Sequence, residues 1–142
     1  MTSNPPPFAL AAVPEIHFGP GRARRLPDDV RALAGTTTAS VLIVADAALV
    51  ELGLVMPLQR GLESAGAKVG LFADITGEPK AGQIDDAAAV ARHREASVVV
   101  ALGGGSALDI GKVAAAIARA GADCMHYALA AKPLPAEGIP AI

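Results

Sequence analysis

The chain of 142 residues has few aromatic side chains, a single cysteine and no tryptophan. Because aromatic residues make up only 3% of the sequence, a core has to be built mainly from Ala, Val, Leu and Ile. The lone Cys124 excludes an internal disulfide framework and suits a reducing compartment. We therefore expect close helix-to-sheet contacts with modest burial per residue.

An excess of charge of one sign is also missing, because 12 basic and 14 acidic residues leave a formal net charge of −2. This balance gives no electrostatic footprint for nucleic acid or for an anionic membrane. No continuous apolar run reaches about 18 residues, and residues 1–7 lack the basic region and apolar run of a secretory signal. We expect a soluble, cytoplasmic protein with no nucleic-acid or membrane partner.

The length suits one domain, with a flexible leader over residues 1–12 and a folded part over residues 13–142. Apolar patterning predicts strands over 15–18, 40–45, 68–72 and 98–102 and another beginning near Ile139. Helical spacing covers 23–33, 58–65, 84–91 and 105–120, while Gly77, Pro79 and Gly82 are placed in a loop. This alternation predicts an α/β, Rossmann-like parallel sheet with helices on both faces.

The stretch over residues 97–112 contains the strongest functional signal. Its apolar run 98–102 suits a strand that is covered on both faces. Gly103, Gly104 and Gly105 then allow the backbone to approach a bulky ligand closely. The helix that follows presents its first N–H groups and the positive end of its dipole to this turn. Together they predict a cradle for a phosphate group.

Spacing excludes two common glycine motifs. A Walker A loop needs glycine where Ser106 stands, and it needs Ser or Thr where Val113 stands. A G-x-G-x-x-G fingerprint that begins at Gly103 needs a third glycine at the position of Leu108. The phosphate cradle is therefore of another type.

The string does match another pattern, Gly-Gly-Gly-Ser-x-x-Asp-x-Ala-Lys. The matching residues are Gly103, Gly104, Gly105, Ser106, Asp109 and Lys112, while Gly111 replaces the usual Ala. In this the chain resembles the iron-type (group III) alcohol dehydrogenases, whose relatives include glycerol dehydrogenase and dehydroquinate synthase. Further likeness lies in residues 18–21, 42–46, 77–79 and 139–142, so it covers nearly the whole chain in order.

The resemblance implies a dehydroquinate synthase-like N-terminal domain, with residues 13–142 as a nucleotide-binding domain truncated at its C-terminal end. It implies NAD as the partner, with NADP less favoured, and a small alcohol or aldehyde as the substrate of the parent enzyme. It also implies a divalent metal, iron in the parent, held by one Asp and three His of a helical domain that this chain lacks. The chain alone is then expected to be inactive, and a homo-oligomer is compatible with the family.

Ser106 and Asp109 have two interpretations. A Ser-x-x-Asp spacing before a helix is close to a capping box, in which Ser106 satisfies an orphan N–H. The resemblance instead implies that these positions lie around the cofactor, with Asp109 toward the ribose or the active-site cleft. Lys112 lies three residues on, where it can pair with Asp109, hold a phosphate or remain solvated.

Asp46 follows the predicted strand 40–45, at the sheet edge where ligands bind in open α/β folds. A carboxylate there can accept hydrogen bonds from a ribose diol and repel the extra phosphate of NADP, which agrees with the NAD-preferring members of the family. The alternative is an Asp that caps a helix beginning at Ala47.

The histidines His17, His93 and His126 are scattered and have no partner at helical spacing, so we expect them to hold no metal. The loop 77–80 departs from the family pattern at Glu78 and Lys80, and we expect no cofactor contacts from it. Two other function classes stay open: a non-catalytic nucleotide- or phosphate-binding module, and an assembly fragment that docks on full-length subunits.

Overall fold

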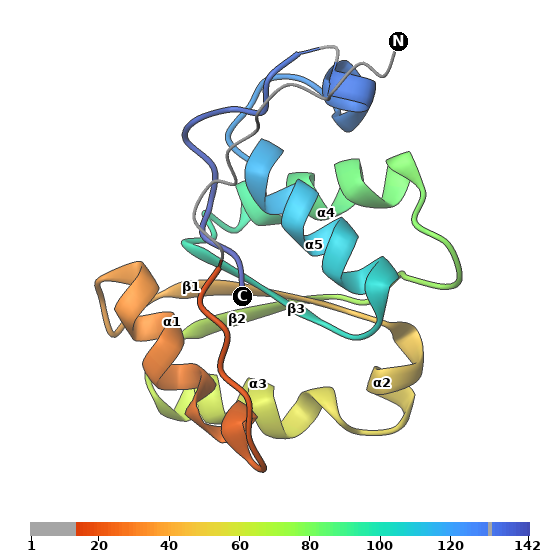
Figure 1. The fold of residues 1–142 in the computed structure, drawn as a ribbon. Helices are drawn as coiled ribbons and strands as arrows, with labels where there is room; N and C mark the ends of the chain where they lie inside the picture. The colour runs from red at the N-terminus through yellow and green to blue at the C-terminus, as the bar shows by residue number, and fades with distance from the viewer. Residues whose placement is uncertain (1–13, 131) are drawn as a thin grey trace, which may run out of the picture.

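The computed structural model describes residues 14–130 and 132–142, so the predicted leader over residues 1–12 lies outside the described residues. Three strands, β1 (Ser40–Ala45), β2 (Lys68–Phe72) and β3 (Val98–Leu102), form a parallel sheet in the order β2-β1-β3 (Figure 1). These bounds match the predicted strands 40–45, 68–72 and 98–102. The predicted α/β parallel architecture is confirmed.

Helices link the strands and cover both faces of the sheet. The α-helices are α1 (Leu26–Ala34), α2 (Ala47–Glu51), α3 (Val55–Ser64), α4 (Ala81–His93) and α5 (Gly105–Ile117), and two 3-10 segments are η1 (Arg22–Arg25) and η2 (Cys124–Ala130). Figure 1 shows α4 and α5 on one face of the sheet and α1 and α3 on the other. The chain is therefore wound on both sides, as right-handed crossovers between parallel strands require.

Alternating side chains of β1 explain why its sequence is apolar at every position. Leu42 and Val44 pack into a cluster with the alanine-rich helices α4 and α5. Val41 and Ile43 pack on the opposite face with Leu26 of α1 and with α3. Successive strand residues point to opposite faces, so a strand between two helical layers needs apolar residues of both parities.

Small residues let α5 lie close to the sheet. A Cβ added to Gly111 would lie 2.7 Å from Ala101 Cβ and 3.6 Å from Val44 Cβ. Because real Cβ atoms do not approach that closely, an alanine here would push α5 away from β1 and β3. The glycine that departs from the family pattern therefore sets the distance between this helix and the strands.

The N-terminal segment differs from its prediction. Residues 15–18 form no strand, and Ile16 and Phe18 are 80% and 100% exposed. The edge of β3 that faces away from β1 is paired with the C-terminal segment. Val99 N–H donates to the Pro140 carbonyl at 2.9 Å, and Ala101 N–H donates to the Ile142 carbonyl at 2.8 Å. The alternating pattern of residues 15–18 therefore cannot pair with β3 on this side.

Three smaller boundaries also differ. The strand predicted near Ile139 is reduced to one parallel bridge between Val99 and Ala141. Gly82 lies in the first turn of α4 rather than in a loop. The helix predicted over 105–120 ends at Ile117.

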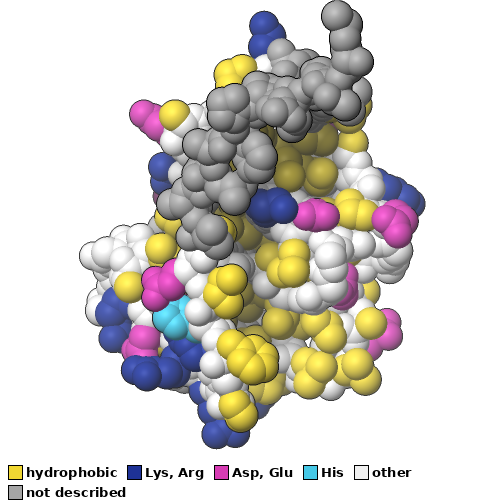
Figure 2. All heavy atoms as spheres, viewed as in Figure 1, with side chains coloured by type: hydrophobic (Ala, Val, Ile, Leu, Met, Phe, Trp, Pro, Cys, Tyr) yellow, Lys and Arg dark blue, Asp and Glu magenta, His cyan; other side chains and the backbone are white. Residues whose placement is uncertain are grey.

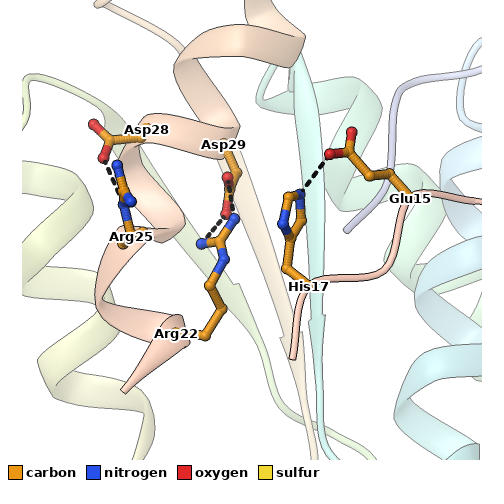
Figure 3. Close-up of polar contacts among 6 residues, drawn as sticks. All are labelled: Glu15, His17, Arg22, Arg25, Asp28 and Asp29. Carbon is orange, nitrogen blue, oxygen red and sulfur yellow. Dashed lines mark hydrogen bonds and ion pairs between the residues drawn. The ribbon is translucent and has the colours of Figure 1, made fainter. Parts of the chain in front are cut away.

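Polar contacts tie the segment before α1 to that helix (Figure 3). The Arg22 guanidinium donates two hydrogen bonds to the Asp29 carboxylate, at 2.9 and 2.7 Å. These bonds hold the pKa of Asp29 below its usual value and raise that of Arg22. His17 lies 2.9 Å from Glu15, on the exposed segment.

The surface is mixed in character. Figure 2 shows hydrophobic side chains over the middle of the face that it draws and basic side chains gathered with acidic ones toward its lower left. None of the helices in the described part of the chain is long and apolar enough to span a bilayer.

Candidate functional site

The candidate site lies at the carboxyl edge of the sheet, between β1 and β3. From β1 the chain passes through α2 and α3 to β2 on one side, and from β2 it crosses through α4 to β3 on the other side. The two connections therefore lie on opposite faces of the sheet, and Ala45 and Leu102 end the neighbouring strands β1 and β3 in register. In open α/β sheets this is the place where ligands bind. The topology thus marks the same place as the glycine motif.

Asp46 and the triglycine turn meet at this point. The N–H of Gly104 donates a hydrogen bond of 2.8 Å to Asp46 Oδ2, and the Asp46 N–H donates to the Leu102 carbonyl at 3.3 Å. Asp46 occupies the cap position of α2, but its side chain makes no capping hydrogen bond. Asp46 therefore stands at the cap position of α2, but the predicted capping by its side chain is wrong. The carboxylate instead accepts from Gly104, beyond the end of the neighbouring strand β3.

The start of α5 is open to solvent. Gly104 is the cap residue, and Gly103, Gly104 and Gly105 are all exposed. The N–H groups of Gly105 and Ser106 have no acceptor among residues 14–130 and 132–142, whereas the N–H of Gly104 donates to Asp46. Orphan donors and the positive dipole end of a 13-residue helix favour an anion here.

Ser106 lies inside the first turn of α5, after Gly105, rather than at the cap. No side-chain hydrogen bond caps this helix, so the capping-box interpretation of Ser106 and Asp109 is wrong. The glycine turn carries the chain into helical geometry before Ser106 is reached, so Ser106 does not occupy the cap position from which a hydroxyl accepts from the N–H two or three residues on. The half-buried Ser106 borders the open amides.

Asp109 and Lys112 form an exposed ion pair, with Lys112 Nζ 2.9 Å from Asp109 Oδ1. Of the three alternatives for Lys112 (pairing with Asp109, holding a phosphate or remaining solvated), the structure shows the ion pair with Asp109. The pair lies on the first turns of α5, beyond the amides that face the turn. It brings one positive and one negative group to this side of the site with no net charge.

No three His, Cys, Asp or Glu side chains come together as metal ligands in the part of the chain that the structure describes. The single thiol, Cys124, is buried, and its backbone N–H donates to Asp85 Oδ1 at 2.7 Å. Burial and the neighbouring Asp85 carboxylate raise the pKa of this thiol, so it stays protonated and unreactive at neutral pH. The described residues therefore do not fit a metal ion.

The contact between Asp46 and Gly104 is the feature that sequence reasoning missed. Both residues follow strands that were predicted correctly, and parallel strands bring their carboxyl ends to one edge. The sequence thus contained the signal for proximity. It contained none for the particular donor, because the two residues are 58 positions apart.

Comparisons with known proteins agree with this geometry. The family described as iron-containing alcohol dehydrogenase matches residues 14–142. Long-chain-alcohol dehydrogenase 1 of Geobacillus thermodenitrificans is 34% identical over 105 residues, which cover 74% of this chain and 26% of that protein. The chain therefore spans about a quarter of the length of this relative.

Two solved structures share the fold. Sulfoacetaldehyde reductase from Bifidobacterium kashiwanohense, solved in complex with NAD⁺, superposes with a TM-score of 0.77 at 28% identity, over 87% of this chain and 31% of that one. NADH-dependent butanol dehydrogenase A from Thermotoga maritima gives a TM-score of 0.81 at 22% identity, over 95% and 33% of the two chains. The family match over residues 14–142 shows that this chain belongs to the iron-containing alcohol dehydrogenase family.

Proposed function

We propose that the chain binds NAD and forms the nucleotide-binding part of an oxidoreductase that interconverts alcohols and aldehydes by hydride transfer. The observation that carries the proposal is the meeting of Asp46 with the Gly103–Gly105 turn at the switch point between β1 and β3. Family membership and the NAD⁺ complex of the sulfoacetaldehyde reductase support the choice of ligand.

The residues fit a dinucleotide in two places. The open amides of Gly105 and Ser106, at the positive end of α5, suit the diphosphate. Asp46 Oδ1 has no hydrogen-bond partner in the described chain and can accept one from a ribose hydroxyl. A bound nicotinamide ring would supply the acceptor for hydride.

The same carboxylate disfavours NADP. A phosphate ester on the ribose would replace a hydroxyl donor by a group of negative charge, which Asp46 repels. Asp109 does not add to this repulsion in the same measure, because Lys112 pairs with it at 2.9 Å. The site is therefore suited to NAD more than to NADP.

The alcohol chemistry of the proposal belongs to a longer protein. The chain spans about a quarter of its relative Long-chain-alcohol dehydrogenase 1, and the described residues contain no cluster that fits a metal. We expect the 142-residue chain to bind the cofactor without turning over. Production of NADH from NAD and ethanol or a longer alcohol by the purified chain would contradict this expectation.

Calorimetric titration of the purified chain tests the binding proposal. NAD and ADP-ribose should bind, and inorganic phosphate should bind much more weakly because it lacks the ribose contact. Asp46→Gly should lower the preference for NAD over NADP by about tenfold, the effect of losing a hydrogen bond to a charged group. A folded chain that gives no signal with NAD, or an Asp46→Gly variant with an unchanged NAD/NADP ratio, would contradict the proposal.

A further inference from the structure

The three glycines of the turn have different surroundings. A Cβ added to Gly103 would collide with Asp46 Oδ2 and would lie 2.8 Å from Asp46 Cγ and 2.9 Å from Ala107 Cβ. A Cβ added to Gly105 would meet nothing within 4 Å. A Cβ added to Gly104 would have one neighbour, Asp46 Oδ2 at 3.8 Å. Gly103 is therefore the glycine that leaves room for the carboxylate, and Gly105 is the one beside open space.

Gly104 supplies the donor that orients Asp46. Its N–H bonds Oδ2 at 2.8 Å, which is the length of a charge-assisted hydrogen bond, so this amide is already used before any ligand arrives. One oxygen of the carboxylate is thereby fixed, and the other, Oδ1, is left for a ligand. The direction in which Oδ1 is presented depends on the first two glycines.

Resting on the proposed function, we propose that Gly103 and Gly104 are positioning residues for cofactor specificity rather than contacts of the diphosphate. Gly103 leaves the space in which the Asp46 carboxylate lies, and Gly104 holds one of its oxygens. Gly105 and Ser106 are the residues whose amides face the diphosphate. Discrimination between NAD and NADP is thus set by the turn on β3 acting through a carboxylate on β1.

Three single variants separate these roles. Gly103→Ala fills the space of the carboxylate. Gly104→Pro removes the N–H donor at a residue whose φ of −78° proline can adopt. Gly105→Ala is the matched control, since it adds the same methyl group to the same turn in open space.

The measurement is the ratio of NAD and NADP affinities by calorimetry, on variants whose folding is checked by circular dichroism. Gly103→Ala and Gly104→Pro should each lower the preference for NAD by about tenfold. Gly105→Ala should change both affinities by a similar factor and leave the ratio unaltered. In an Asp46→Ala background, Gly103→Ala should no longer change the ratio, because the group it displaces is gone.

The outcomes distinguish this inference from the proposed function. If the unchanged chain binds NAD and either folded variant, Gly103→Ala or Gly104→Pro, retains the full preference, the positioning role is overturned while the proposed function stands. If Gly103→Ala shifts the ratio equally with and without Asp46, the effect does not act through the carboxylate and the inference is again overturned. If the unchanged, folded chain binds neither nucleotide, the proposed function is overturned together with the inference that rests on it.

Discussion

Two glycine turns in this chain have similar backbones and opposite surroundings. Gly19 and Gly103 have φ values of 159° and 150°, and each precedes a helical segment. A Cβ at Gly19 would meet nothing within 4 Å, whereas one at Gly103 would collide with Asp46. The first turn follows an unpaired segment, and the second follows a strand that is buried in the sheet. A glycine turn becomes a candidate site when a neighbouring strand end places a functional group against it.

The largest expected effect is on stability at the second turn. Gly103→Ala should lower the free energy of unfolding by about 3–4 kcal/mol, since backbone strain adds to overpacking against Asp46 and Ala107. Gly19→Ala, at nearly the same φ, should cost only the strain, about 1–2 kcal/mol. Urea unfolding of both variants measures the difference. Equal losses would show that the surroundings of the two turns do not matter.

The next effect concerns the helix that follows the second turn. Gly111→Ala should destabilise the chain by about 1–2 kcal/mol, because the clash with Ala101 exceeds the gain in helix propensity. Gly82→Ala, in the first turn of α4 with nothing within 4 Å, should be neutral or stabilising by up to about 1 kcal/mol. Thermal unfolding measures the stability of the two variants against the unchanged chain. An increase in Tm for Gly111→Ala would contradict the close approach of α5 to the sheet.

The helix after the first turn is held by ion pairs as well as by the packing of Leu26 and Val30. Asp29→Asn should lower Tm modestly at neutral pH by weakening the paired bonds from Arg22, while Asp28→Asn should do less, since its ion-pair distances are 3.7 and 3.8 Å. The folded-state pKa of Asp29 is depressed, so its stabilisation is present above the ordinary pKa of about 3.9 and is lost as the pH falls through the folded value. Scans from pH 7 to 2 should show the wild-type advantage over Asp29→Asn disappear on acidification. An advantage that persists at pH 2 would contradict this origin.

The smallest effect is expected at the exposed pair on α5. Lys112→Gln should change the free energy of unfolding by less than about 0.5 kcal/mol, because solvent screens such pairs. The same variant leaves Asp109 unneutralised beside the diphosphate site and should weaken NAD binding severalfold. Asp109→Asn is the matched control and should not weaken it. A large loss of stability in Lys112→Gln would assign the pair a structural role.

Much of the site could be predicted because its parts are local. The apolar run before Gly103 predicted β3, and the run before Asp46 predicted β1, both with the bounds that the structure has. Their common edge follows from the parallel order of strands. The partner of each polar group could not be predicted, and of the two interpretations of Ser106 the capping one is wrong because Gly104, not Ser106, occupies the cap position.

The sequence by itself determined the three strands, the fold class and the glycine turn, because strand bounds and turn glycines reflect the chemistry of consecutive residues. Only the tertiary structure decided that residues 15–18 are not a strand, that Gly111 sets the approach of α5, and that Gly104 holds Asp46. Each of these depends on contacts between groups that are distant in the chain and adjacent in the fold. Sequence pattern reports what a segment can do, and competition for edges, space and donors decides what it does.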